Sequence, residues 1–213
     1  MQIAKTSKET TDYRKGIYGK NYRWEKDLKT GLLKPRRHNG IDLQAPVGTP
    51  VYAICNGIIT KARGNCPDGF QSRETGWSYG NEIRIQGTVI NPSTGEEQEM
   101  IFQYSHLQYA NAIALNFKTG QLFKEADWVY AGELIGYTGE SGNAYGVPFT
   151  HLHFGAQIVG EYKWIDPLPY LNATYDLNTI NSNSGKMTIL ECDDDSNNFE
   201  ENDEDAIDES FEE

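Results

Sequence analysis

The amino-acid sequence predicts a mainly β protein, with one mostly antiparallel β-sheet or sandwich domain and long loops around a groove. From about residue 40 onward, short runs of β-branched and aromatic residues alternate with clusters of Gly, Pro, Asn and Ser, as expected of strands joined by turns. Helical character is modest and confined to one segment, and the sequence contains no internal repeat.

The first predicted strands are two short runs and a hairpin. Residues 51–54 (VYAI) and 57–62 (GIITKA) are β-branched and are separated by the turn-like CNG. Residues 81–86 (NEIRIQ) alternate apolar and polar side chains and lead into the turn cluster NPSTG. The run at 99–107 (EMIFQYSHL) completes a hairpin, which ends by presenting His106.

The second half of the domain alternates strands with loop segments. Residues 108–128 are interpreted as a helix or an irregular insertion. GELIGYTG at 132–139 precedes a glycine-rich loop at 140–148, which is expected to form a wall of the groove. THLHFGAQIV at 150–159 is the next strand, and DPLPYL at 166–171 is a proline-punctuated exit.

The two ends of the chain differ from this body in charge. Residues 1–35 are expected to form a basic polar arm in front of a folded domain at 36–175. Of the 31 acidic residues, 13 lie in 191–213, which has no Lys or Arg, so we interpret 176–213 as a linker and a disordered acidic tail. The tail is either a solvated end or a docking segment for an unknown basic partner or for the basic arm.

Composition excludes several classes of function. No basic patch is interleaved with aromatic residues, which argues against nucleic-acid binding, and no apolar run is long enough to form a transmembrane segment. A monomer is the default expectation. None of the three cysteines forms a C-x-x-C pair, so a cysteine zinc site is not supported. Cys55 and Cys66 could bridge in an oxidising compartment or could stay buried or free thiols, and Cys192 lies in the tail.

Two of the four histidines lie two positions apart in the predicted strand at 150–159. Because successive side chains of a strand point to opposite faces, His151 and His153 share a polar face with Gly155 and Gln157. The opposite face carries the apolar side chains expected in the core: Leu152, Phe154, Ala156 and Ile158.

A second candidate group lies upstream, in HNGID. His38 and Asp42 are separated by three residues, and Gly40 and the prolines downstream favour an extended, turn-bearing segment over a helix. A histidine nitrogen and a carboxylate oxygen suit Zn²⁺. One further histidine from the His-x-His strand would leave the fourth tetrahedral position open for water, as expected of a catalytic zinc site.

Taken in order, HNGID (38–42), YSHL (104–107), GELIGYTG (132–139) and HLHF (151–154) resemble the lysostaphin-type (LytM-like) zinc metallopeptidases, which are peptidoglycan endopeptidases. The resemblance spans about residues 36 to 171 and includes the pieces APVGTPVYA, YGNEIRI and DPLPYL. It implies that the folded domain is a metallopeptidase domain of the duplicated-hybrid-motif type. Each short motif is weak alone, whereas the ordered set is specific.

The resemblance also implies roles for all four histidines. One Zn²⁺ per chain would be bound by His38, Asp42 and His153. His106 and His151 would be the catalytic histidines, one acting as general base and the other stabilising the oxyanion, with the assignment left open.

The implied function is a zinc-dependent endopeptidase that hydrolyses peptide bonds in peptidoglycan stem peptides or cross-bridges with a metal-activated water. An alternative is a catalytically inactive or regulatory member that binds the cell wall or activates other wall hydrolases, and a third is a zinc hydrolase of other peptides. The expected location is extracytoplasmic (periplasmic, cell surface or secreted), although no signal sequence is seen in this chain. Family members often place a tyrosine near the first ligand, but Tyr18 and Tyr22 precede His38 by a longer interval and receive no assignment.

Overall fold

The structure is a computed structural model, and it describes residues 2–3, 16, 18–19, 21–27, 29–67, 78–109, 112–116, 118–146 and 150–171. The predicted tail at 176–213, Cys192 and parts of the arm at 1–35 lie outside these residues. The domain boundaries expected at 35 and 175 stay predictions.

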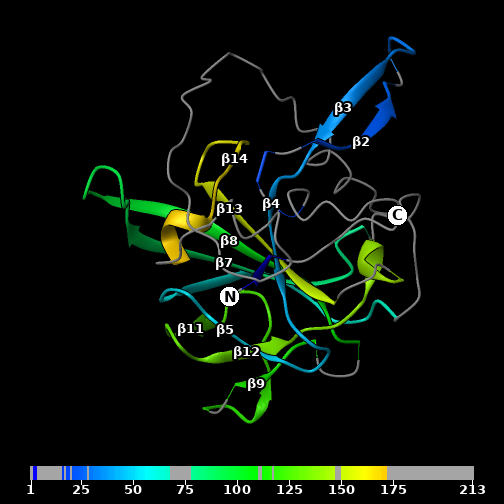
Figure 1. The fold of residues 1–213 in the computed structure, drawn as a ribbon. Coiled ribbons are helices and arrows are strands. Elements are labelled where there is room, and N and C mark those ends of the chain that lie inside the picture. Colours follow the sequence, from blue (N-terminus) through cyan, green and yellow to red (C-terminus); the bar gives the residue numbers. More distant parts are fainter. Residues whose placement is uncertain are drawn as a thin grey trace.

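An eight-stranded antiparallel sheet organises the fold (Figure 1). Its strand order is β1-β4-β13-β8-β7-β6-β11, and β14 pairs with β13. The strands are β1 (Gln2–Ile3), β4 (Gly40–Gln44), β6 (Gly57–Arg63), β7 (Asn81–Ile90), β8 (Glu97–Leu107), β11 (Trp128–Val129), β13 (His151–Ile158) and β14 (Trp164–Ile165). Strand β13 thus lies between β4 and β8, which brings three segments far apart in sequence side by side.

Three small antiparallel pairs complete the fold. They are β2 (Asn21–Lys26) with β3 (Leu33–Arg37), β5 (Pro50–Tyr52) with β12 (Leu134–Tyr137), and β9 (Leu115–Asn116) with β10 (Gln121–Leu122). Two short 3₁₀-helices, η2 (Gly142–Ala144) and η3 (Leu168–Leu171), lie within the described part of the chain, which contains no α-helix. The predicted mainly β fold is confirmed.

The sequence left two interpretations for residues 108–128, a helix or an irregular insertion. Its described residues contain β9, β10 and the start of β11 but no helix, so the helical alternative is wrong and the insertion is irregular. Two-residue strands joined by turns explain why its apolar residues lack a sustained helical period.

The predicted hairpin of β7 and β8 is confirmed. The two strands pair from Ile90 opposite Glu97 down to Asn81 opposite Leu107. Their turn is fixed by the side chain of Asn91, whose Oδ1 accepts a hydrogen bond of 2.9 Å from the Ser93 N–H.

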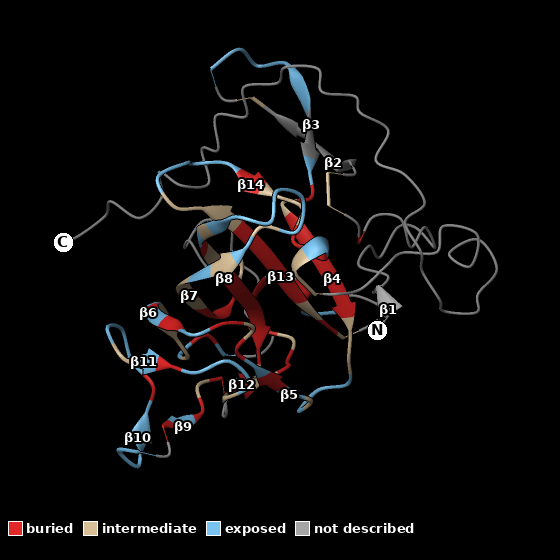
Figure 2. Cartoon of the chain, turned by 90° about the vertical axis from the view of Figure 1, so that its left-hand side faces the viewer, coloured by how far each residue is buried: buried red, intermediate tan, exposed pale blue. Residues whose placement is uncertain are grey.

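The apolar core lies against one face of the large sheet. Phe154 of β13 lies opposite Tyr104 of β8, and Ala156 lies opposite Phe102, as the alternation in 150–159 predicts. The rings of Phe102 and Phe154 stack with centroids 5.8 Å apart, and both side chains are fully buried. Figure 2 shows buried residues concentrated along β4, β8 and β13. With the apolar side chains committed to this face, the polar residues of β13 lie on the other.

The described residues include both cysteines of the folded body, for which the sequence left a disulfide or two thiols open. Cys55 and Cys66 are both buried, and no disulfide joins them in the structure. Burial raises the pKa of Cys55 to about 11.

Among the described residues, no helix combines the length and the apolar character that a membrane span requires.

Candidate metal centre

Strand register places the first two candidate ligands next to each other. Asp42 of β4 lies directly opposite His153 of β13, and His153 in turn lies opposite Ser105 of β8. Directly opposite residues of an antiparallel pair share one face of the sheet. The carboxylate of Asp42 and the imidazole of His153 are therefore neighbours on the face away from the apolar core.

The third candidate ligand, His38, lies just before β4 and completes a compact triangle. Its Nε2 is 3.2 Å from Asp42 Oδ1 and 3.1 Å from His153 Nδ1, while His153 Nδ1 is 3.0 Å from Asp42 Oδ1. All three residues are buried, with at most 7% of their surface exposed.

This triangle fits a zinc ion. In a tetrahedral site with bonds of about 2.0–2.1 Å, neighbouring ligand atoms lie about 3.3–3.4 Å apart, close to the separations seen between His38, Asp42 and His153. Two imidazole nitrogens and one carboxylate oxygen are ligands that zinc accepts, and three protein ligands leave one tetrahedral position for water or substrate.

Gly40 provides the space that the His153 ring occupies. A Cβ atom at Gly40 would lie 2.8 Å from both Cε1 and Nε2 of His153, and 2.6 Å from the carbonyl oxygen of Phe154. Gly155, opposite Gly40, gives similar room to the indole of Trp164, whose Cζ3 would lie 2.6 Å from an added Cβ. The absence of a side chain at Gly40 is thus what allows the His153 ring to occupy its position in the site.

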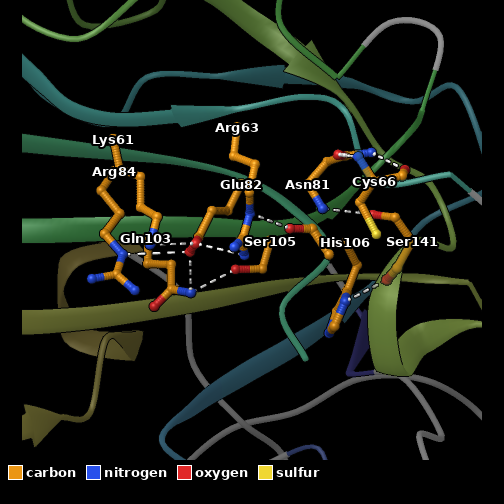
Figure 3. A network of polar contacts seen from close by, with 11 residues as sticks. Lys61, Arg63, Cys66, Asn81, Glu82, Arg84, Gln103, Ser105, His106 and Ser141 are labelled. Atoms are coloured by element: carbon orange, nitrogen blue, oxygen red, sulfur yellow. Dashed lines mark hydrogen bonds and ion pairs between the residues drawn. The ribbon is translucent and has the colours of Figure 1, made fainter. Parts of the chain in front are cut away.

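Asp42, His153 and Ser105 lie opposite one another on β4, β13 and β8, and the next residue in this row is Glu82 of β7. Glu82 is the centre of a buried ionic network (Figure 3). Glu82 lies opposite Ser105, is fully buried, and its Oε1 is 2.9 Å from Arg63 Nη2 and 3.1 Å from Lys61 Nζ. Gln103 Nε2 donates hydrogen bonds of 2.8 Å to both Glu82 Oε2 and Ser105 Oγ. Side-chain contacts therefore tie β6, β7 and β8 together beside the candidate metal centre.

Electrostatics favours the metal-binding forms of two candidate ligands, Asp42 and His153. Burial alone would raise the pKa of Asp42, but the nearby charges of His38 and His151 and the hydrogen bond from His153 outweigh it and hold that pKa well below its ordinary value. Burial lowers the pKa of His153, although Asp42 partly opposes the shift. An ionised carboxylate and a neutral imidazole are the ligand forms that metal binding requires.

The remaining histidines, His106 and His151, lie beside the triangle. The His151 Nε2 is 3.6 Å from Asp42 Oδ1, and the ring centroids of His106 and His151 are 5.1 Å apart. The His106 and His153 centroids are 5.9 Å apart. The fold thus brings all five candidate residues into one buried cluster, while their catalytic and metal-binding roles stay predictions.

His106 reaches this cluster through a β-bulge that the sequence pattern did not reveal. Simple alternation along β8 puts His106 on the core face with Phe102 and Tyr104. In the structure, Glu82 lies opposite Ser105 and Asn81 lies opposite Leu107, which leaves His106 as an extra, unpaired residue with φ of 62°. The bulge turns the imidazole toward the histidine cluster.

The protonation of the His106 ring follows from its hydrogen bond. Nδ1 lies 2.9 Å from the carbonyl oxygen of Ser141, and because a carbonyl only accepts, Nδ1 must carry the proton. Nε2 of the neutral ring therefore keeps a free lone pair. Burial, with the charge of His151 second, lowers the pKa of His106 well below its ordinary value, so the ring is neutral at neutral pH.

Tyr79 was not singled out from the sequence and yet belongs to the site. Its ring centroid lies 5.6 Å from that of His153 and 6.5 Å from that of Trp164. Its hydroxyl accepts a hydrogen bond from Asn39 Nδ2, and Asn39 directly follows His38 in the chain. The available signal was the position of Tyr79 in YGNEIRI, two residues before the predicted strand at 81–86.

The two tyrosines considered from the sequence behave differently. The Tyr18 hydroxyl donates a hydrogen bond to the carbonyl oxygen of Trp164, so its hydroxyl is directed to β14. The side chain of Tyr22 lies outside the description. Tyr79 is therefore the tyrosine whose ring is found in contact range of a candidate ligand.

Comparisons with known proteins point in one direction. The model of Peptidase family M23 matches residues 36–167. L-Ala–D-Glu endopeptidase of Bacillus subtilis is 33% identical over 146 residues, which cover 65% of this chain and 35% of that protein. DD-carboxypeptidase/endopeptidase Mpg of Neisseria meningitidis is 32% identical over 127 residues, which cover 59% of this chain and 21% of that protein. The chain thus spans about a fifth to a third of the length of these curated relatives.

A solved structure is similar as well. The catalytic domain of lysostaphin from Staphylococcus simulans aligns with 25% sequence identity and a TM-score of 0.45, covering 74% of this chain and 90% of that domain.

The close contact between Gly40 and the His153 ring should make zinc affinity sensitive to any side chain at position 40. Gly40→Ala should lower the affinity for zinc about 10-fold or more, because the added methyl group displaces the His153 ring from its ligand position. A competition titration against a chromophoric chelator measures this affinity. Gly95→Ala is the matched control, since Gly95 has φ of 75° but nothing within 4 Å of an added Cβ. Equal affinities in the two variants would contradict the packing argument.

The buried histidines predict a pH dependence of stability. In zinc-free protein, the free energy of unfolding should fall as pH drops below about 6.5, because the unfolded chain binds protons that neutral His106 and His153 do not. The slope reaches about 1.4 kcal/mol per pH unit for each such proton. Asp42, with its lowered pKa, adds a further loss below about pH 4.

Urea unfolding at a series of pH values measures this slope, and His106→Gln serves as comparison because it removes one of the titrating groups. A wild-type stability that does not change between about pH 7 and about pH 5 would contradict the buried, neutral state of these rings.

Proposed function

The chain belongs to peptidase family M23, and we propose that it is a zinc-dependent endopeptidase that hydrolyses peptide bonds in the stem peptides or cross-bridges of peptidoglycan. The observation that carries the proposal is the buried triangle of His38 Nε2, Asp42 Oδ1 and His153 Nδ1, which fits one zinc ion. The wall substrate is supported by the family, and endopeptidase activity is supported by the two relatives reported above, which are both named as endopeptidases.

A zinc ion held by His38, Asp42 and His153 would polarise the scissile carbonyl and lower the pKa of a water molecule bound to it. The chain's own residues would then handle the protons. His106 would act as general base, because its Nδ1–H is committed to the Ser141 carbonyl and its Nε2 is left to accept the proton of the attacking water.

His151 would stabilise the negative charge that develops on the carbonyl oxygen. Its ring lies 5.1 Å from that of His106, and its Nε2 lies at the edge of the Asp42 carboxylate. An imidazole N–H in a buried site is an effective donor to an oxyanion, because little water competes with it. This assignment divides the two roles that the sequence left open.

The regulatory alternative has no specific observation in its favour. An inactive member of the family is expected to lack one or more metal ligands, whereas this chain has the three candidate ligands and both neighbouring histidines in one cluster. Action on peptidoglycan would require an extracytoplasmic location, which is therefore part of the proposal.

The proposal is tested by incubating purified peptidoglycan with zinc-loaded protein and analysing the released soluble fragments by mass spectrometry. New peptide termini within a stem peptide or a cross-bridge support an endopeptidase and identify the bond. If zinc-loaded protein releases no fragment from several chemically different walls, the proposed substrate is wrong.

The ligand assignment predicts that His153→Ala binds no stoichiometric zinc, because it removes one of three protein ligands. Metal content after extensive dialysis, measured by atomic emission, gives the result. Gln157→Ala is the control, since Gln157 lies on the same face of β13 but outside the candidate cluster. One zinc per chain in His153→Ala would overturn the assignment.

The assignment of His106 as general base predicts a different outcome for His106→Ala. This variant should retain zinc but lose turnover about 10²- to 10⁴-fold, the contribution typical of general acid–base catalysis. Steady-state hydrolysis of the peptide identified from the wall fragments measures the loss. Near wild-type turnover in a zinc-loaded variant would leave His106 without a catalytic role.

A further inference from the structure

His106 adopts a backbone conformation that needs external support. Its φ of 62° lies in the left-handed region, which residues other than glycine adopt only where surrounding contacts fix it. Its N–H donates a hydrogen bond of 2.9 Å to the Tyr79 carbonyl, and its own carbonyl accepts one of 2.9 Å from the Gly139 N–H. The backbone of the bulge is thus held from outside the β7–β8 ladder.

Asn81, the first residue of β7, supports the bulge through its side-chain amide. It lies opposite Leu107 and is fully buried. Its Oδ1 accepts a hydrogen bond of 2.7 Å from the Cys66 N–H, and its Nδ2 donates to the Cys66 carbonyl at 2.9 Å and to the Leu107 carbonyl at 3.2 Å. The Asn81 amide therefore uses its acceptor and both of its donor hydrogens on backbone groups.

Ser141 connects Asn81 to the His106 ring (Figure 3). The Ser141 Oγ accepts a hydrogen bond of 2.9 Å from the Asn81 N–H and donates one of 2.7 Å to the Leu107 carbonyl. The Ser141 carbonyl then accepts the Nδ1–H of His106 at 2.9 Å. Leu107, which follows His106 in the chain, and Ser141, whose carbonyl accepts the ring N–H, are thus both bonded to the same asparagine.

The approach of Ser141 is close enough to depend on a glycine. Gly80 has φ of 63°, and a Cβ there would lie 2.4 Å from Ser141 Oγ and 2.6 Å from the Ser141 carbonyl oxygen. The segment Gly80–Asn81 therefore both admits Ser141 and binds it.

We propose that Asn81 is a positioning residue for the reaction: it holds Ser141 and Leu107 so that His106 keeps its Nδ1–H on the Ser141 carbonyl and presents Nε2 to the candidate metal centre. The proposal rests on the proposed function for its catalytic consequence, but the orientation and tautomer of the ring are properties of the protein alone. Asn81 itself lies outside the triangle of candidate ligands and acts only through Ser141 and Leu107.

A purely structural role for Asn81 must be separated from positioning. Asn116 offers a matched control, because it is also a buried asparagine, with 6% of its surface exposed, and its Oδ1 accepts a hydrogen bond from a backbone N–H, that of Lys118. It lies in β9, and its oxygen atoms accept hydrogen bonds from the N–H groups of Lys118, Thr119 and Gly120 in the turn that follows.

The test compares Asn81→Ala and Asn116→Ala in the full zinc-loaded chain, well below their unfolding temperatures. Asn81→Ala should lower kcat about 10- to 100-fold with KM and zinc content unchanged, as expected of a misplaced base. Long-range ¹H–¹⁵N correlation spectra should show His106 as a single Nδ1–H tautomer in the wild type and as a mixture in Asn81→Ala. Asn116→Ala should match the wild type in both measurements.

A single Nδ1–H tautomer and an unchanged kcat in Asn81→Ala would overturn the proposal, as would an equal loss of kcat in Asn116→Ala. If Asn81→Ala does not fold, Ser141→Ala takes its place, since it keeps the carbonyl acceptor but removes the hydroxyl bonds to Asn81 and Leu107. If the wild type cleaves no peptide, the proposed function fails, and the tautomer spectra alone then decide whether Asn81 positions the ring.

Discussion

The antiparallel register between β4 and β13 is the constraint on which the candidate site depends. It sets Asp42 opposite His153 on one face of the sheet and Ile41 opposite Phe154 on the other. Because side chains alternate along a strand, a slip of one residue would exchange the two pairs between core and site. Ile41 and Phe154 are fully buried, so the apolar core fixes the register that brings the polar residues together.

Burial of the cluster has a cost that its mutual contacts offset. A buried carboxylate and several buried imidazoles lose their hydration, which is unfavourable unless each finds a partner. Asp42 has three histidines around it, and these keep it ionised despite its burial. The same exclusion of water strengthens the interactions of the cluster with a metal ion or a developing charge. The cluster is thereby prepared to bind a metal ion.

Local features of the site could be predicted from the sequence, whereas its tertiary contacts could not. Alternation in β13 correctly placed Phe154 in the core and His153 on the polar face, because a side-chain period of two is a local property of the strand. The room that Gly40 gives to the His153 ring and the ring contact of Tyr79 depend on segments far apart in sequence. The bulge at His106 breaks the alternation for the same reason, since its backbone donates a hydrogen bond to the Tyr79 carbonyl and accepts one from the Gly139 N–H.

A crystal structure of the zinc-loaded protein, with anomalous data collected at the zinc absorption edge, would test the candidate metal centre most directly. We expect one anomalous peak per chain, within about 2.0–2.2 Å of His38 Nε2, Asp42 Oδ1 and His153 Nδ1. His106 and His151 would lie near the peak without ligating it. A peak ligated by other residues, or no peak in zinc-saturated crystals, would show that His38, Asp42 and His153 do not form the zinc site.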